Sequence, residues 1–263
     1  MTKIITIPGE TFADVRSTAP SIEWIPPKLT GVEALFMAPK YVPASGVWVE
    51  PKSSEKDMVL GTFASQTVIP TINAASSQMN GKPSIYFKSG NGGTSNGSGD
   101  RTKVLTRQWK LARKKISLAI CFANHNLVAV TVTRTLCSYA GADGLTFRFE
   151  SSGVNSKMAI VVNGTRTELQ ALAVNGGTGI PSNKLHVIIN ENKMDIYVNG
   201  VLDTTIPNLT FSALTGTFVL GCNEIGSNTT KFHGLVGICD TYKGAMTLSE
   251  IAADVAYMTN IYG

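Results

Sequence analysis

The sequence predicts an all-β protein, built as a two-sheet antiparallel jelly-roll sandwich, and three observations support this prediction. About a dozen short apolar segments recur at spacings of roughly 8 to 14 residues, which is the spacing of strands in a sandwich. Turn-forming residues separate them, including 25 glycines. Hydrophobic residues make up 43% of the chain and charged residues only 16%, a balance that excludes a disordered chain.

The N-terminal segment, residues 1–30, differs from the rest of the chain. It shows little hydrophobic periodicity and carries several prolines, which are Pro8, Pro20, Pro26 and Pro27. Proline lacks the backbone donor that a central strand needs. We therefore predict an extended N-terminal arm over residues 1–30 and a β-sandwich domain over residues 31–263. The alternative is that this segment adds an edge strand to the same domain.

The middle of the chain alternates strand signals with turn signals. Apolar runs predict strands over residues 34–37, 47–49, 116–122, 127–132, 145–149 and 157–162. A Gly/Ser/Asn-rich stretch, residues 89–102, predicts an exposed loop. Asn163-Gly164 favours a two-residue hairpin, because both residues tolerate positive φ.

The last third reads as a strand meander that ends in a helix. Residues 185–190 and 194–198 predict strands on either side of a polar turn at Glu191-Asn192, and Asn199-Gly200 predicts a second hairpin. Further strands are predicted over residues 218–220 and 232–240. Thr247 and Glu250 have the spacing of a capping box, which predicts the start of a short helix near the C-terminus.

Several of these residues carry a family resemblance. The positions concerned are Tyr197, Asn199, Gly200, Gly221, Phe232, Gly234, Tyr242, Leu248, Glu250 and Ile251, together with the earlier run Asn80–Phe87. Their pattern resembles the laminin-G-like, concanavalin-A-like jelly-roll domains over roughly residues 30 to 260. The resemblance implies a lectin-like sandwich that binds sugars or proteins through loops at one rim, in some members through a calcium ion.

Five polar loop residues are candidates for such a rim site: Asp143, Asn175, Asn223, Glu224 and Asn228. No loop shows the paired acidic pattern of the family's calcium site, so calcium is the only cofactor left open and its ligands are not assigned. The alternative for each residue is an ordinary turn-forming role.

A basic cluster between residues 101 and 115 contains seven cations around one tryptophan. Its candidate contacts to an anionic polymer are Arg107, Trp109, Lys110 and Arg113. One aromatic side chain among seven cations is a weak signal for base stacking, so nucleic acid is not an expected partner. The alternative is that the cations protect an exposed edge strand.

The sequence favours a protein that is not an enzyme. It has no strand with paired carboxylates, no GxSxG motif, and no metal-ligand spacing among its 4 cysteines and 3 histidines. We expect the cysteines to be buried and free of disulfides. The alternative hypothesis is a polysaccharide-cleaving glycosidase or lyase that uses Glu191, Asp195 or Glu224.

The setting follows from a combination of features. No signal peptide and no apolar run long enough to span a membrane is present, so neither secretion by a cleaved signal nor membrane insertion is expected. An arm joined to a lectin-like sandwich resembles a bacteriophage virion component, such as a tail, fibre or head-decoration protein assembled in the host cytoplasm. We therefore expect a homo-oligomer whose arm contacts other virion proteins and whose sandwich contacts host-surface glycan or a neighbouring subunit.

Overall fold

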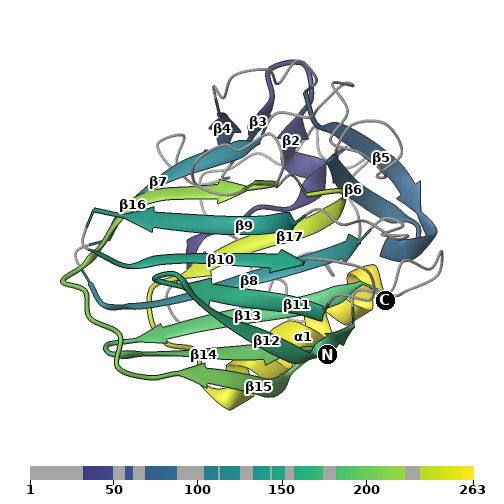
Figure 1. Cartoon of the computed structure of the whole chain (residues 1–263). Helices are drawn as coiled ribbons and strands as arrows, with labels where there is room; N and C mark the ends of the chain where they lie inside the picture. The colour runs from purple at the N-terminus through teal and green to yellow at the C-terminus, as the bar shows by residue number, and fades with distance from the viewer. Residues whose placement is uncertain are drawn as a thin grey trace, which may run out of the picture.

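Two large antiparallel β-sheets face each other in this protein (Figure 1). The computed structural model describes residues 32–49, 57–61, 69–87, 104–111, 113–124, 133–142, 144–151, 157–173, 182–222 and 232–263. The predicted all-β, two-sheet antiparallel jelly-roll sandwich is confirmed. The predicted arm, the strand at 127–132 and the whole Gly/Ser/Asn-rich loop lie outside the described residues.

The first sheet is called the helix-side sheet below, because an α-helix covers its outer face. Its strands, in spatial order, are β15 (Val201–Ile206), β14 (Lys193–Val198), β13 (Asn183–Asn190), β8 (Lys115–Asn124), β17 (Gly234–Tyr242), β6 (Lys82–Phe87) and β5 (Thr71–Ser76). The short strand β1 (Val32–Ala34) also pairs with β17. Strands distant in the sequence are therefore neighbours at the centre of this sheet.

The second sheet is called the opposite sheet. Its order is β12 (Thr165–Ala173), β11 (Lys157–Val162), β10 (Thr146–Ser151), β9 (Arg134–Gly141), β16 (Leu214–Leu220), β7 (Leu105–Leu111) and β4 (Val59–Leu60). A small sheet pairs β2 (Tyr41–Val42) with β3 (Val47–Trp48), and two 3₁₀ turns are η2 (Ala38–Lys40) and η4 (Ser77–Met79).

The core between the sheets contains an aromatic stack centred on Trp109 of β7. Its ring lies parallel to that of Phe218, with centroids 5.1 Å apart, and stacks on Tyr139 at 5.0 Å. Phe147 completes the group at 6.4 Å from Trp109. Such ring pairs contribute about 0.5 to 1.5 kcal/mol each beyond the area they bury. The strands β7, β16, β9 and β10 are thus tied together by side chains as well as by backbone bonds.

The helix α1 (Leu248–Tyr262) begins where the capping box predicted. Thr247 Oγ1 accepts a bond from the backbone N–H of Glu250, and the Thr247 N–H donates to Glu250 Oε2 at 2.8 Å. The helix has 15 residues, so the prediction of a short helix was wrong in length. Apolar side chains at Ile251, Met258 and Ile261 recur on one helical face and extend the packing over about three turns.

This face of α1 covers the outer side of the helix-side sheet. Strand β13 shows the consequence, since Leu185, Val187 and Ile189 join the core between the sheets while Ile188 joins the cluster under the helix. A strand buried on both faces reads as a continuous apolar run instead of alternating with polar residues. The sandwich therefore has three layers at this point.

A polar contact lies within the layer under the helix. His186 Nε2 and Asp254 Oδ2 are 2.8 Å apart, and both side chains are fully buried. Tyr242 donates its hydroxyl hydrogen to Asp254 Oδ1 at 3.3 Å. Burial and the neighbouring Asp240 and Asp254 carboxylates raise the pKa of Tyr242, so the phenol keeps the proton that it donates. Strands β13 and β17 are thereby joined to the helix.

The predicted turns are present. Asn199 and Gly200 have φ values of 51° and 86°, and Asn163 and Gly164 have 47° and 84°, as hairpins with two left-handed residues require. Glu191 also adopts a positive φ of 60° at the turn between β13 and β14. A non-glycine residue in this region is uncommon, and the turn belongs to the candidate site.

The cysteines provide a direct test of the core. Cys121, Cys137, Cys222 and Cys239 are all buried and free, as predicted. Burial raises the pKa of Cys121 to about 12, so at neutral pH its thiol is protonated. We expect no thiol to react with Ellman's reagent in the native protein at pH 8, and all four to react in guanidinium chloride. Rapid labelling of the native protein would contradict this burial.

No helix among the described residues is both long enough and apolar enough to span a membrane.

Candidate functional site

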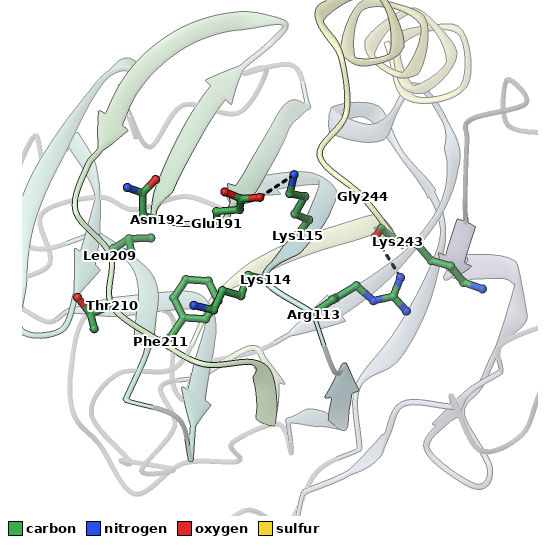
Figure 2. Close-up of a pocket in the computed structure, with 10 residues that line it drawn as sticks. All are labelled: Arg113, Lys114, Lys115, Glu191, Asn192, Leu209, Thr210, Phe211, Lys243 and Gly244. Atoms are coloured by element: carbon green, nitrogen blue, oxygen red, sulfur yellow. Dashed lines mark hydrogen bonds and ion pairs between the residues drawn. The ribbon is translucent and has the colours of Figure 1, made fainter.

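A groove of about 770 Å³ lies where several connections meet at one end of the sandwich (Figure 2). Four segments line it: residues 113–115 at the start of β8, 191–192 between β13 and β14, 209–211 between β15 and β16, and 243–244 after β17. We call it the basic groove. It is built from connections other than those that carry the rim residues chosen in the sequence analysis.

Backbone bonds hold the segments of the groove together. The Glu191 N–H donates to the Lys114 carbonyl at 2.9 Å, and the Leu209 N–H donates to the Asn192 carbonyl at 2.7 Å. The first bond continues the pairing of β13 with β8, in which Asn190 lies opposite Lys115. The left-handed turn at Glu191 therefore places its carboxylate beside the basic segment.

Four cations and one carboxylate line the basic groove. Lys115 Nζ lies 2.9 Å from Glu191 Oε1. Arg113 donates to the Lys243 carbonyl at 3.1 Å and forms an ion pair with Glu33 at 3.5 Å. The charges of Lys115 and Arg113 are thus partly balanced by carboxylates.

Two lysines retain their charge in the groove. Lys114 Nζ lies over the ring of Phe211, 5.9 Å from its centroid, and neither it nor Lys243 forms an ion pair with any residue that the structure describes. Both side chains are exposed. The groove therefore has an excess of positive charge, which attracts anions.

Glu191 is suited to balancing charge and not to donating a proton. The hydrogen bond and the charge of Lys115 lower the pKa of this exposed carboxyl from its ordinary value. A general acid in a glycosidase needs a raised pKa. Glu191 is therefore ionised throughout the neutral range and competes with other anions for Lys115.

Of the other two carboxylates in the enzyme hypothesis, the described one, Asp195, does not line the groove. Asp195 is largely buried on β14, where it accepts hydrogen bonds from Lys193 Nζ and Thr205 Oγ1, both at 2.7 Å. Glu224 lies outside the described residues. Glu191 is the one carboxylate among the described residues that line the groove.

The predicted contacts to an anionic polymer separate into two groups. Arg107 and Trp109 point into the sandwich. Arg107 is buried 3.7 Å from Glu33 and donates to Thr241 Oγ1, and Trp109 belongs to the aromatic stack. Lys110 is exposed on β7, whereas Arg113 lines the basic groove. Alternation along β7 explains the division, because successive side chains face opposite sides of a sheet.

The predicted rim residues Asp143, Asn175, Asn223, Glu224 and Asn228 all lie outside the described residues. Within the described part, no three His, Cys, Asp or Glu side chains come together as metal ligands would. Calcium binding stays a prediction. The sequence analysis missed Lys243 and Phe211, because no local pattern indicates that they lie beside the cluster of cations near residue 113.

The two facing sheets, the covering helix and the rim groove define a lectin-like jelly-roll domain. Residues 125–252 match the family model described as the concanavalin A-like lectin/glucanases superfamily. The sandwich of this chain therefore has the concanavalin A-like fold, and the match over residues 125–252 agrees with the resemblance seen in the sequence. None of the curated protein sequences matches this chain significantly.

Solved structures of the same fold come from proteins of different activities. Domain 4 of an extracellular GH43 arabinanase from Geobacillus stearothermophilus, in complex with arabinotriose, has a TM-score of 0.58 and 14% identity, covering 87% of this chain and 100% of that one. The receptor-binding domain of botulinum neurotoxin mosaic serotype C/D has a TM-score of 0.56 and 12% identity, covering 87% and 51%. A Trypanosoma rangeli sialidase has a TM-score of 0.52 and 11% identity, and the match covers 88% of this chain and 33% of the sialidase chain.

These identities show a shared fold and nothing more specific. The chain spans about half of the neurotoxin domain and a third of the sialidase. The fold therefore occurs in carbohydrate-binding domains and in chains of glycosidases alike.

Proposed function

We propose that this chain is a lectin-like binding module that holds a glycan in the basic groove and breaks no bond. The observation that carries the proposal is the groove itself, an open site at the sandwich rim with two lysines whose charge is not balanced. The arabinanase domain, which matches this fold over 100% of its own length, was solved in complex with arabinotriose. That structure supports sugar binding as a task this architecture performs.

The arrangement of carboxylates favours binding over hydrolysis. Glycosidases need two carboxyl groups on either side of the scissile bond, about 5 to 9.5 Å apart, one of them with a raised pKa. The described groove contains Glu191 alone, and its pKa is lowered. A glycosidase or lyase remains the second hypothesis, and it would require Glu224 or another residue outside the described part.

Replacing Glu191 distinguishes the two hypotheses. We expect Glu191→Gln to raise affinity for an acidic oligosaccharide about two- to fivefold, because Lys115 is released to the ligand and a repulsive carboxylate is removed. The gain should be constant from about pH 6 to 8, where the lowered pKa keeps Glu191 ionised in the wild type. Titration calorimetry measures the affinity.

The same variant tests hydrolysis. Release of reducing ends from the bound oligosaccharide by the wild type, and its loss in Glu191→Gln, would establish a catalytic carboxylate and reject the binding-only proposal.

We also propose the setting in which the module works. The N-terminal arm, residues 1–30, docks on other proteins of a bacteriophage virion. The sandwich contacts host-surface glycan or a neighbouring subunit. The protein forms a homo-oligomer that is assembled in the host cytoplasm. This part rests on the composition of the sequence. It concerns residues that the structure does not describe.

Light scattering tests the arm. The full chain should form a defined oligomer, and removal of residues 1–30 should yield a smaller species with unchanged thermal unfolding. Loss of folding in the truncated chain would show that this segment belongs to the sandwich instead.

The proposed function is tested by a glycan array with the purified full chain, run with calcium and again with a chelator. Reproducible binding is expected, and sensitivity to the chelator would show that binding requires a metal ion. A blank array from well-folded protein would reject glycan binding.

A further inference from the structure

A second hollow adjoins the basic groove. It has a volume of about 650 Å³ and is lined by residues 243–247, 249 and 250. Lys243 and Gly244 line both hollows, so both border the segment that leads from β17 to α1. Each volume falls within the roughly 300 to 1,000 Å³ of sites that enclose a small ligand. Together they offer room for more than one sugar unit.

The two hollows differ in chemistry. The basic groove presents Lys114 and Lys243, neither of which forms an ion pair with a described residue. The second hollow presents the exposed Ser249, whereas the Thr247 hydroxyl donates to Glu250 Oε2 at 2.9 Å and accepts from the Glu250 N–H. Its carboxylate, Glu250, accepts a hydrogen bond from the Thr247 N–H at 2.8 Å in the capping box. This end of the site is therefore polar, and its one negative charge is already hydrogen-bonded within the protein.

The apolar residues of the basic groove contribute little exposed surface. Phe211 is 5% exposed and Leu209 is 8% exposed, so no broad ring face is open for stacking on a sugar. A neutral saccharide would therefore gain little here beyond hydrogen bonds. Charged hydrogen bonds are about twice as strong as neutral ones, and the groove is equipped for them.

We infer that the ligand is an acidic oligosaccharide of at least two sugar units. The carboxylate or sulfate of one unit lies in the basic groove beside Lys114. The next unit lies along Lys243, which lines both hollows, and reaches Ser249 in the second hollow. This inference rests on the proposed glycan-binding function and adds the charge and minimum length of the ligand.

The test is an array of acidic oligosaccharides, each printed beside its neutral counterpart. Galacturonate oligomers are paired with their carboxyl-reduced forms, and heparin-derived oligomers with their desulfated forms, in lengths of one, two and four units. Acidic dimers and tetramers should bind at least about tenfold more tightly than monomers and than neutral partners. Binding should weaken as salt is raised from about 50 to 500 mM, because added ions screen the contact.

Lysine variants locate the contact. Lys114→Gln and Lys243→Gln should each weaken binding of the acidic tetramer about five- to tenfold. Lys82→Gln is the matched control, since Lys82 is exposed and lines neither hollow. Ser249→Ala should weaken the tetramer and leave the acidic monomer unchanged, which separates the second hollow from the first without removing the Thr247 cap of α1.

The possible outcomes distinguish failure of this inference from failure of the proposed glycan binding. Equal binding of the neutral partners would overturn the inference and leave glycan binding in place. A blank array from folded protein would reject both this inference and the proposed glycan binding. Displacement of the acidic tetramer by a single-stranded DNA 12-mer at equal charge would overturn the inference in favour of a general anionic-polymer site, and unchanged affinity in both lysine variants would move the contact elsewhere.

Discussion

Replacing Trp109 with alanine should lower the free energy of unfolding by about 3 to 5 kcal/mol, the usual cost of removing a large aromatic side chain from a core. The ring is 1% exposed and lies between Phe218 and Tyr139, so its loss leaves a cavity lined by aromatic rings. It also removes ring contacts that join β7 to β16 and β9. Urea denaturation followed by circular dichroism measures the effect.

Two controls separate this effect from a role at the surface. Trp109→Phe should cost about 1 to 2 kcal/mol, because a ring is retained and the indole N–H that is lost has no hydrogen-bond partner among the described residues. Lys110→Gln, at the exposed neighbouring position, should change stability by less than about 0.5 kcal/mol. If Trp109→Ala unfolded at the same urea concentration as the wild type, the core position of the ring would be contradicted.

The behaviour of Trp109 shows where sequence reasoning loses information. Seven cations within fifteen residues suggested one basic surface. In the structure, period-2 alternation turns Arg107 and Trp109 inward and leaves Gln108 and Lys110 outside. The burial of Arg107 depends on Glu33 of β1, which lies 3.7 Å away. A partner so distant in the sequence leaves no local signal.

Sequence signals that depend on neighbouring residues predicted the structure more accurately. The Asn199-Gly200 hairpin and the Thr247–Glu250 capping box were both predicted correctly, because each depends on residues within one turn. The length of α1 was not, since its later turns are stabilised by packing on a sheet whose order the sequence does not reveal. Local chemistry determines where an element starts, and tertiary contacts determine how far it extends.

The candidate site follows the same rule. Arg113 was proposed from the basic cluster and Glu191 from the enzyme hypothesis, and both line the basic groove. Lys243 joins them only because β17 and β13 lie on either side of β8. Strand order in a jelly roll is set by long connections, so a site formed across three strand ends is found only when the fold is known.

The contact between Asp254 and His186 is expected to be the second large determinant of stability. Asp254→Ala should cost about 2 to 5 kcal/mol, because His186 Nε2 and the Tyr242 hydroxyl would lose their acceptor in a layer that water does not reach. The effect should concentrate in α1. Hydrogen exchange should show faster exchange for helix amides than for those of β9 and β10, which lie in the opposite sheet.

Asp254→Asn is the matched control for this prediction. An amide keeps an acceptor oxygen in the same place, so one of the two hydrogen bonds can persist and the loss should be roughly half that of alanine. A double-mutant cycle with His186→Phe then isolates the pair, and contacting buried groups give coupling energies of about 0.5 to 3 kcal/mol. A coupling energy of zero, or a helix no less protected than the opposite sheet, would mean that apolar packing alone holds α1 on the sandwich.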